Sequence, residues 1–420
     1  MKILTISNLY PPNAVGGYEV LCFEVMQALA RKGYEIAVLT SNYGNKHVDD
    51  IPNQRILRYL TLLAHEENIY LPLNISAARR SEINQKNLQY FEQALKDFYP
   101  DIIFIWNLHF FDVSLIESVE HTNIKRVYLL SDNWLINFYN SQFIAKYFSQ
   151  IVHSPSNYLH TILRSIRNSF ATIGRETKMI HGFAIFPSTY MQNLYTDAGF
   201  KFEEAKIIYH GVSSLKTATP RIDRENLIAA NKLKLLFAGR VVDIKGVHTA
   251  IEALALINTA LPRLEISLSI VGDTRDQQYL SRLKNLITQL HLEDQVCFSP
   301  PIPEQELFSL FQDYDIYLFP SLYEPFSLTL IHALQAGIPT IASTAGGNIE
   351  IILDQKTGLL FRQSDAKHLA RQVIKLAHNP KLRASLGRQA QTYADQFTFE
   401  RMIEQVEAHL KYLSESNKSL

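Results

Sequence analysis

Cysteine is scarce in this sequence, with two residues among 420. Cys22 and Cys297 lie far apart in the chain and do not have the spacing of metal ligands. A metal site built from several cysteines is therefore excluded. We expect two buried thiols in a protein of a reducing cytosol.

Net charge and long apolar segments are also absent. The 41 basic residues balance the 41 acidic ones, so the chain as a whole has no charge that attracts nucleic acid. No apolar run approaches the roughly 20 residues that span a bilayer. The first apolar stretch, Lys2 to Ser7, is too short for a secretory signal and is soon followed by two prolines. These absences predict a soluble, cytoplasmic protein and leave peripheral attachment to a membrane open.

The chain is long enough for two domains with complete cores. Short apolar strands alternate with helical patterns in both halves, which is typical of parallel sheets with helices on both faces. We predict an α/β protein with two doubly wound, Rossmann-like domains facing each other across a cleft. The predicted domains are residues 1–215 and 216–395, followed by a last helix within 396–420.

The stretch from Tyr317 to Ile351 has the most distinctive pattern. It predicts a strand, a loop that carries Glu324, a helix that ends at Gly337, a second strand, and a loop with Gly346 and Gly347. The loops of such a unit lie together at the carboxyl edge of a parallel sheet. Glu324 is therefore expected beside a helix N-terminus, where a carboxylate can accept hydrogen bonds from a polyol.

This stretch resembles the signature of the retaining GT-B glycosyltransferases of family four. The residues that carry the resemblance are Tyr323-Glu324-Pro325-Phe326-Ser327, Ala333-Leu334, Ala336-Gly337-Ile338-Pro339, Gly346-Gly347 and Glu350. In that family a second Glu follows the first by eight positions, and here that place holds His332. The usual Gly after Phe326 is Ser327. The resemblance covers nearly the whole chain and implies that the last helix returns to the first domain.

The N-terminal segment fits the same family. A short strand, a proline-bearing loop and Gly16-Gly17-Tyr18-Glu19 precede a helix, and free amides at a helix start attract phosphate. The family commonly places a His that faces the donor sugar where this chain has Ser131. His109, on a neighbouring loop, is either a substitute for that imidazole or a structural residue.

A pair of cations follows the first strand of the second domain. The segment runs Gly239-Arg240-Val241-Val242-Asp243-Ile244-Lys245-Gly246. A guanidinium grips two phosphate oxygens and an ammonium adds a mobile charge. The pattern resembles the family's diphosphate clamp, so Arg240 and Lys245 are expected to bind the nucleoside diphosphate.

The resemblance implies transfer of a sugar from a nucleotide sugar to a hydroxyl acceptor, namely a glycan, a lipid-linked molecule or a small molecule. Arg240, Lys245 and Glu324 are the expected catalytic residues. The amides of Phe326, Ser327 and Leu328 are expected to bind sugar hydroxyls. Because protein cations meet the leaving group, no metal and no cofactor are expected, and retention needs no separate base.

His332 is expected to bind the donor less well than the family's Glu, because one imidazole nitrogen accepts a single hydrogen bond. On this basis His332→Glu is expected to tighten nucleotide binding. The departures at Ser131, Ser327 and His332 also fit an alternative, a catalytically weakened subunit that only binds nucleotide sugar. A sugar-nucleotide epimerase would need an acid and a base around the sugar, and no such pair is evident.

Residues 133–175 combine many aromatic residues with lysine and arginine, and contain no Asp or Glu between Asn133 and Arg175. One interpretation is an ordinary pair of packed helices. The other is a surface that contacts an anionic membrane or a lipid-linked acceptor. The residues alone leave both open.

Overall fold

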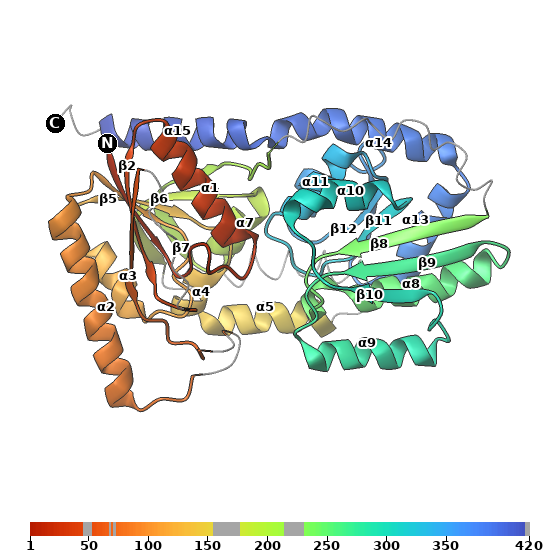
Figure 1. The fold of residues 1–420 in the computed structure, drawn as a ribbon, viewed down its shortest axis with the longest axis horizontal. Coiled ribbons are helices and arrows are strands. Elements are labelled where there is room, and N and C mark those ends of the chain that lie inside the picture. The colour runs from red at the N-terminus through yellow and green to blue at the C-terminus, as the bar shows by residue number, and fades with distance from the viewer. Residues whose placement is uncertain (45–52, 67–68, 70–72, 154–176, 214–230, 416–420) are drawn as a thin grey trace. The chain divides into compact units, whose positions relative to one another are not determined.

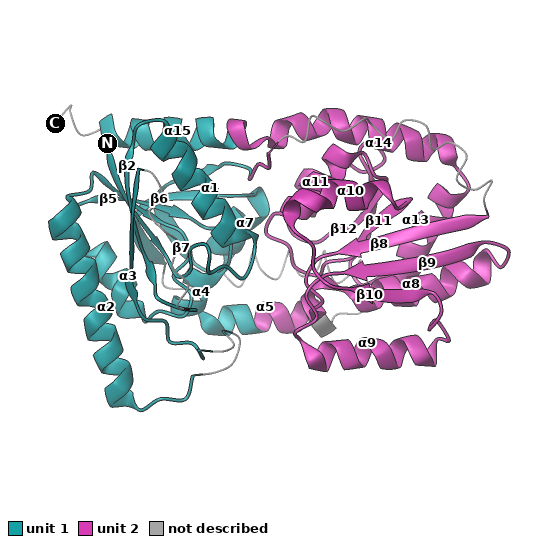
Figure 2. Cartoon of the chain, in the orientation of Figure 1, with its two compact units in different colours: residues 1–145, 168–209, 402–420 teal, residues 146–167, 210–401 magenta. Residues whose placement is uncertain are grey.

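The computed structural model describes residues 1–44, 53–66, 69, 73–153, 177–213 and 231–415. The chain divides into two units, which Figure 2 shows in teal and magenta. Unit 1 is formed by Met1–Ala145, Asn168–Tyr209 and Met402–Leu420. Unit 2 is formed by Lys146–Arg167 and His210–Arg401.

Unit 1 is built on a sheet of seven parallel strands in the order β3-β2-β1-β4-β5-β6-β7 (Figure 1). The strands are β1 (Lys2–Ser7), β2 (Glu35–Ser41), β3 (Gln54–Leu60), β4 (Ile102–Ile105), β5 (Lys125–Leu129), β6 (Lys178–Phe186) and β7 (Phe200–Ile207). The strand order reverses direction at β1, and the central strands are buried apolar runs. Strands of this kind are covered by helices on both faces.

The helices of this part of the chain connect successive strands. They are α1 (Gly17–Arg31), α2 (Ala77–Phe98), α3 (Val113–Glu120), α4 (Trp134–Tyr139), α5 (Ser141–His153) and α7 (Thr189–Asp197). Several begin at a capping side chain: Ser76 accepts from the Arg79 amide and Ser188 from the Met191 amide. The second half of α5, from Lys146 onward, groups with unit 2.

Unit 2 contains six parallel strands in the order β10-β9-β8-β11-β12-β13. They are β8 (Lys232–Ala238), β9 (Glu265–Val271), β10 (Val296–Ser299), β11 (Ile316–Phe319), β12 (Thr340–Ser343) and β13 (Leu359–Phe361). Its core joins the strands to helices α8 (Val247–Ala260) and α13 (Ala366–Ala377), through residues such as Leu235, Ile251, Leu318 and Val373.

The helical elements of unit 2 and the C-terminal helix complete the chain. They are η2 (Asp243–Lys245), α8 (Val247–Ala260), α9 (Gln277–Gln289), η3 (Glu304–Glu306), α10 (Leu307–Gln312), α11 (Leu328–Ala336), α12 (Asn348–Ile351), α13 (Ala366–Ala377), α14 (Pro380–Ala394), η4 (Asp395–Phe397) and α15 (Phe399–Glu415). The η elements are single turns of 3-10 helix.

The two doubly wound parallel sheets confirm the predicted fold class. The strand, loop, helix, strand order between Tyr317 and Ile351 is also confirmed, as β11, α11 and β12. Cys22 is buried as expected, but the expectation was wrong for Cys297, which is exposed. Cys297 lies on β10, an edge strand that has a neighbour on one side only. No helix in the described residues is long and apolar enough to cross a membrane.

The C-terminal helix α15 packs within unit 1 from Met402 onward. Glu407 receives hydrogen bonds from Lys32 at 2.6 Å and from the Tyr34 hydroxyl at 3.0 Å, and forms an ion pair with Lys411 at 2.7 Å. The hydrogen bond from Lys32 and that from Lys411 lower the pKa of Glu407 to about 2. Apolar residues of the same helix, including Val406 and Leu410, are fully buried.

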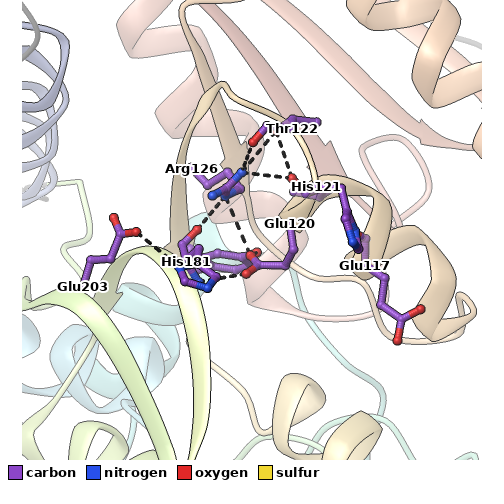
Figure 3. A network of polar contacts seen from close by, with 9 residues as sticks. Glu117, Glu120, His121, Thr122, Arg126, His181 and Glu203 are labelled. Atoms are coloured by element: carbon purple, nitrogen blue, oxygen red, sulfur yellow. Dashed lines mark hydrogen bonds and ion pairs between the residues drawn. The ribbon is translucent and has the colours of Figure 1, made fainter.

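A polar network joins α3, β5 and β6 near the amino end of β5 (Figure 3). Both oxygens of Glu120 are used: one accepts from the Tyr128 hydroxyl and the other from the His181 amide at 2.8 Å. Arg126 donates to the His181 carbonyl at 2.5 Å and lies 3.8 Å from Glu120. The side chains of Arg126 and Glu120 are 11% and 14% exposed, so water compensates little for their loss. This end of the strand is opposite the carboxyl edge expected to carry function.

We therefore expect Glu120→Ala to lower the free energy of unfolding by about 3 kcal/mol, because the Tyr128 hydroxyl and the His181 amide lose their acceptor and the mostly buried Arg126 guanidinium loses its counter-charge. Thermal and urea unfolding measure this loss. Glu117→Ala is the matched control, since Glu117 lies on the same helix with an exposed side chain (Figure 3). Equal stability of the two variants would show that the network contributes nothing.

Candidate functional site

The predicted residues of unit 2 gather at the carboxyl ends of its parallel strands. Arg240 and Lys245 follow β8, Glu324 follows β11, and the glycine pair Gly346-Gly347 follows β12. In open α/β sheets this edge is where ligands bind. The structure therefore brings the predicted clamp and the predicted sugar-binding carboxylate to one edge of one sheet.

The centre of this edge is an ion pair. Lys245 Nζ lies 2.6 Å from Glu324 Oε2, and the two side chains are 15% and 8% exposed. The Ser321 hydroxyl also donates to Glu324 Oε2, at 3.3 Å. A buried carboxylate needs such partners, since burial without them is costly. Lys245 and Glu324 thus form one interacting pair, although they are 79 residues apart in sequence.

The loop that carries the cations is tied to the loop that carries Glu324. The Leu322 amide donates to the Ile244 carbonyl at 2.7 Å. Gly246 has a φ of +66°, and a Cβ at that position would lie 2.2 Å from the Pro320 carbonyl oxygen. Only glycine allows this approach, because it accepts positive φ and has no Cβ. In the predicted Lys-Gly pair, Lys245 therefore supplies the charge and Gly246 allows the close packing of the two loops.

The glycine pair after β12 holds Glu324 from the other side. The Gly347 amide donates to the Glu324 carbonyl at 2.8 Å. Gly346 has a φ of +57°, and a Cβ there would lie 2.0 Å from the same carbonyl oxygen. The backbone of Glu324 is therefore enclosed by the two loops, which fixes where its carboxylate points.

Arg240 is exposed and follows Gly239, whose amide bonds back to β9. The next amide, that of Val241, donates to the Asp273 carbonyl at 2.8 Å. The Asp273 carboxylate is bound mainly by Arg275, which lowers its pKa, and the charge of Arg240 contributes to the same shift. Arg240 is therefore a solvent-accessible guanidinium on the same loop as Lys245.

Ser327 has a structural role that accounts for its presence in place of Gly. It is the N-cap of α11, and its hydroxyl accepts from the Leu330 amide at 3.2 Å. The first amides of α11, in the segment Phe326 to Leu328, lie next to the Glu324 loop. This is the placement expected for amides that bind sugar hydroxyls, and their contact with a sugar stays a prediction.

His332 lies in the middle of α11 and is 3% exposed. Its Nε2 lies 2.7 Å from Glu304 Oε1. A carboxylate only accepts, so His332 donates here rather than accepting from a ligand. The expected benefit of His332→Glu does not fit this geometry, because a second carboxylate would face Glu304. The signal for Glu304 in the sequence was weak: it is one charged residue after the proline-rich segment 300–303.

The predicted residues of unit 1 lie at the carboxyl ends of β1, β4 and β5. The Gly16 amide donates to Glu19 Oε2 at 2.9 Å, forming a capping box that closes the start of α1 on itself. Burial raises the pKa of Glu19. The Gly16 amide is therefore already used in this structure, and phosphate binding at Gly16 and Gly17 stays a prediction.

Ser131 and His109 lie on neighbouring loops of unit 1. Tyr18 donates to the carbonyl oxygens of Trp106 and Leu129, the first at 2.7 Å, and so bridges the ends of β4 and β5. Burial lowers the pKa of His109, while the charge of Asp132 opposes this shift. Burial therefore favours the neutral form of the His109 imidazole, and Ser131 is half-buried.

About half of the segment 133–175, interpreted above either as packed helices or as a surface for an anionic membrane or lipid-linked acceptor, lies outside the described residues, which end at 153 and resume at 177. Its described part includes Tyr147 and Phe148, whose rings pack edge-on against Tyr323 at 6.3 and 5.0 Å between centroids. These two aromatic residues therefore contact the residue that precedes Glu324. Among the described residues, no three His, Cys, Asp or Glu side chains gather as a metal site.

Comparison with known proteins covers most of the chain. Residues 15–214 match the family model described as Glycosyltransferase Family 4, and residues 218–393 match that of Glycosyl transferases group 1. A D-inositol 3-phosphate glycosyltransferase of Arthrobacter is 32% identical over 182 residues, which are 43% of each chain. The match therefore spans less than half of that relative's length.

Solved structures share the fold. Sucrose-phosphate synthase of Thermosynechococcus elongatus has a TM-score of 0.73 at 20% identity, with 98% of each chain covered. Anabaena HepE, solved in complex with UDP and glucose, has a TM-score of 0.65 at 21% identity, with 98% of this chain and 100% of HepE covered. With these matches and two Rossmann-like units, the chain belongs to the group 1, family four type of GT-B glycosyltransferases.

Proposed function

We propose that this protein transfers a sugar from a nucleoside-diphosphate sugar to a hydroxyl acceptor. The observation that carries the proposal is the ion pair between Lys245 and Glu324, set beside Arg240 at the carboxyl edge of unit 2. Two cations and an enclosed carboxylate match the two parts of such a donor, a diphosphate and a polyol. The UDP and glucose bound by HepE make UDP-glucose the first donor to test.

The cations act on the leaving group. When the bond between the anomeric carbon and the diphosphate oxygen breaks, its electron pair stays on the diphosphate. Arg240 binds two of the phosphate oxygens and Lys245 a third, so that positive charge is in place before negative charge develops. The bond to the loop of Glu324 keeps Lys245 at this position.

Glu324 acts on the sugar. An ammonium has three donors, so Lys245 donates to Glu324 and to a phosphate oxygen at the same time. The second carboxylate oxygen then accepts from a sugar hydroxyl and fixes the anomeric carbon relative to the acceptor. The first amides of α11 donate to further oxygens of the same sugar.

We propose that the reaction retains the anomeric configuration. The acceptor oxygen attacks from the face that the diphosphate leaves, and the acceptor's proton passes to the departing phosphate oxygen. The proton and the electron pair thus both end on the diphosphate, and no side chain is needed as a base. Ser131 in place of His is compatible with this course. The same two cations remove the need for a divalent metal.

Arg240→Ala is expected to lower the rate of transfer by about 10²-fold or more, because the charge that meets the leaving diphosphate is lost. The measurement is release of free UDP from UDP-glucose with and without a panel of acceptors, including monosaccharides and D-inositol 3-phosphate. Arg263→Ala, at another exposed arginine of unit 2, is the control. UDP binding without acceptor-dependent release in the unaltered protein would favour the binding-subunit alternative.

Addition of EDTA is expected to leave acceptor-dependent UDP release unchanged within twofold, since Arg240 and Lys245 supply the positive charge. The same assay with added Mg²⁺ or Mn²⁺ measures whether a divalent ion increases the release of UDP, and no increase is expected. Activity that disappears with EDTA and returns with one of these ions would contradict the metal-free mechanism.

Gly346→Ala is expected to weaken UDP-glucose binding at least tenfold, because its Cβ would overlap the Glu324 carbonyl and push the sugar-binding carboxylate away. Gly33→Ala is a matched control: Gly33 also has positive φ, +90°, but no atom lies within 4 Å of the added Cβ. The control is expected to cost about 1 kcal/mol of stability without a change in affinity. Calorimetric titration with UDP-glucose measures the affinity of both variants, and thermal unfolding measures their stability. Unchanged affinity in Gly346→Ala would refute the role of this loop.

A further inference from the structure

Three aromatic residues that no step of the proposed reaction uses pack together in unit 2. Tyr147 and Phe148 lie in the second half of α5, and Tyr323 lies in the loop between β11 and α11. The ring centroids are 5.8 Å apart for Tyr147 and Phe148, 5.0 Å for Phe148 and Tyr323, and 6.3 Å for Tyr147 and Tyr323. The interplanar angles are 81°, 70° and 77° in the same order, so all three contacts are edge-to-face, an arrangement that aromatic pairs prefer. The rings therefore connect α5 to the loop that carries Glu324.

The rings of Tyr147 and Phe148 are packed against protein. Both residues are half-buried. The exposed residues between positions 141 and 151 of the same helix are all small or polar: Ser141, Gln142, Ala145, Lys146 and Ser149. A surface for an apolar partner would expose the aromatic residues instead. The described part of α5 therefore uses these two rings for contact with Tyr323.

Tyr323 lies between two anchored peptides of an irregular loop. On one side, the Leu322 carbonyl accepts a hydrogen bond from Gln363 at 3.1 Å. On the other side, the Glu324 carbonyl accepts from the Gly347 amide at 2.8 Å. Tyr323 itself is 5% exposed, and its large ring is the part of this segment that α5 contacts. The packing of that ring therefore restricts the rotation of the peptide that precedes Glu324.

This peptide matters for one part of the donor more than for the other. One oxygen of Glu324 is bound by Lys245, and in the proposed function the second oxygen accepts from a sugar hydroxyl. Rotation of the preceding peptide would displace that second oxygen. Arg240 lies on a different loop, so the guanidinium expected to bind the diphosphate would keep its place. The aromatic contacts are thus expected to affect recognition of the sugar rather than of the nucleotide.

We propose that Phe148 and Tyr147 are positioning residues of the transfer reaction. Packed against Tyr323, they hold Glu324 in the orientation that binds the transferred sugar. They act through Tyr323 and do not contact the sugar themselves. This inference rests on the proposed function, because it requires that a nucleotide sugar binds at the loop of Glu324.

The test compares each nucleotide sugar with its nucleotide. UDP-glucose and UDP, and likewise the GDP and ADP pairs, are titrated calorimetrically into the full-length protein and its variants. For the nucleotide sugar that binds best, Phe148→Ala is expected to weaken binding about tenfold, and binding of the matching nucleotide at most about twofold. The kcat of acceptor-dependent nucleotide release is expected to fall about tenfold as well, because the anomeric carbon is aligned less well with the acceptor.

Further variants separate positioning from a general loss of stability. Phe148→Tyr keeps the ring and is expected to bind the nucleotide sugar within about twofold of the unaltered protein. Phe143→Ala is the matched control, since Phe143 is a half-buried phenylalanine of the same helix in the part that groups with unit 1. It is expected to lower the melting temperature without changing the ratio of the two affinities. If Phe148→Ala does not fold, Phe148→Leu takes its place.

A double variant tests whether Phe148 acts through Tyr323. Tyr323→Ala removes the ring that the two α5 residues contact, so it is expected to weaken binding of the nucleotide sugar by itself. Adding Phe148→Ala to Tyr323→Ala is then expected to have no further effect, because the contact is already lost.

The outcomes are distinct. If the unaltered protein binds none of the three nucleotide sugars, the proposed function fails and this inference fails with it. If it binds one of them and Phe148→Ala leaves both affinities unchanged or lowers them equally, the proposed function stands and the inference is overturned. A change of the ratio in Phe143→Ala as large as that in Phe148→Ala overturns it too, as does a full effect of Phe148→Ala in the protein that lacks the Tyr323 ring.

Discussion

The ion pair between Lys245 and Glu324 is the interaction on which the organisation of unit 2's functional edge depends. Its two members come from loops after neighbouring strands, β8 and β11, and both are mostly buried. A buried charge without its partner is strongly destabilising, so the two loops are constrained to one relative position. The backbone bond from Leu322 to Ile244 and the close contact at Gly246 add to that constraint.

The ion pair between Lys245 and Glu324 suits both the folded protein by itself and the proposed transfer reaction. Glu324 neutralises Lys245, so the mostly buried ammonium is not left without a counter-charge. In the proposed reaction, the ammonium contacts phosphate and carboxylate at once. A preorganised site of this kind has little reorganisation left to perform when charge develops on the leaving group. The aromatic contacts of Tyr147 and Phe148 with Tyr323 hold the adjacent residue of the same loop.

The departures from the family signature acquire physical reasons in the structure. Ser327 caps α11 with its hydroxyl, a function that Gly cannot perform through a side chain. His332 does not stand alone as a weaker substitute for Glu. It is paired with Glu304, so a carboxylate is present at this place on a different element of the chain. A comparison of single sequence positions does not reveal this pairing, because Glu304 and His332 are 28 residues apart.

Local sequence alone determined the elements whose apolar runs are short and bounded by glycine or proline. The strand before Glu324 (β11), the helix that ends at Gly337 (α11) and the glycine-bearing loops after β8 and β12 lie where the sequence predicts them, since backbone preferences act over a few positions. Only the tertiary structure decided that Lys245 bonds Glu324, that Glu19 takes the Gly16 amide, and that Glu304 meets His332. Hydrogen bonds between side chains depend on distances across folded loops, and no local pattern encodes those distances.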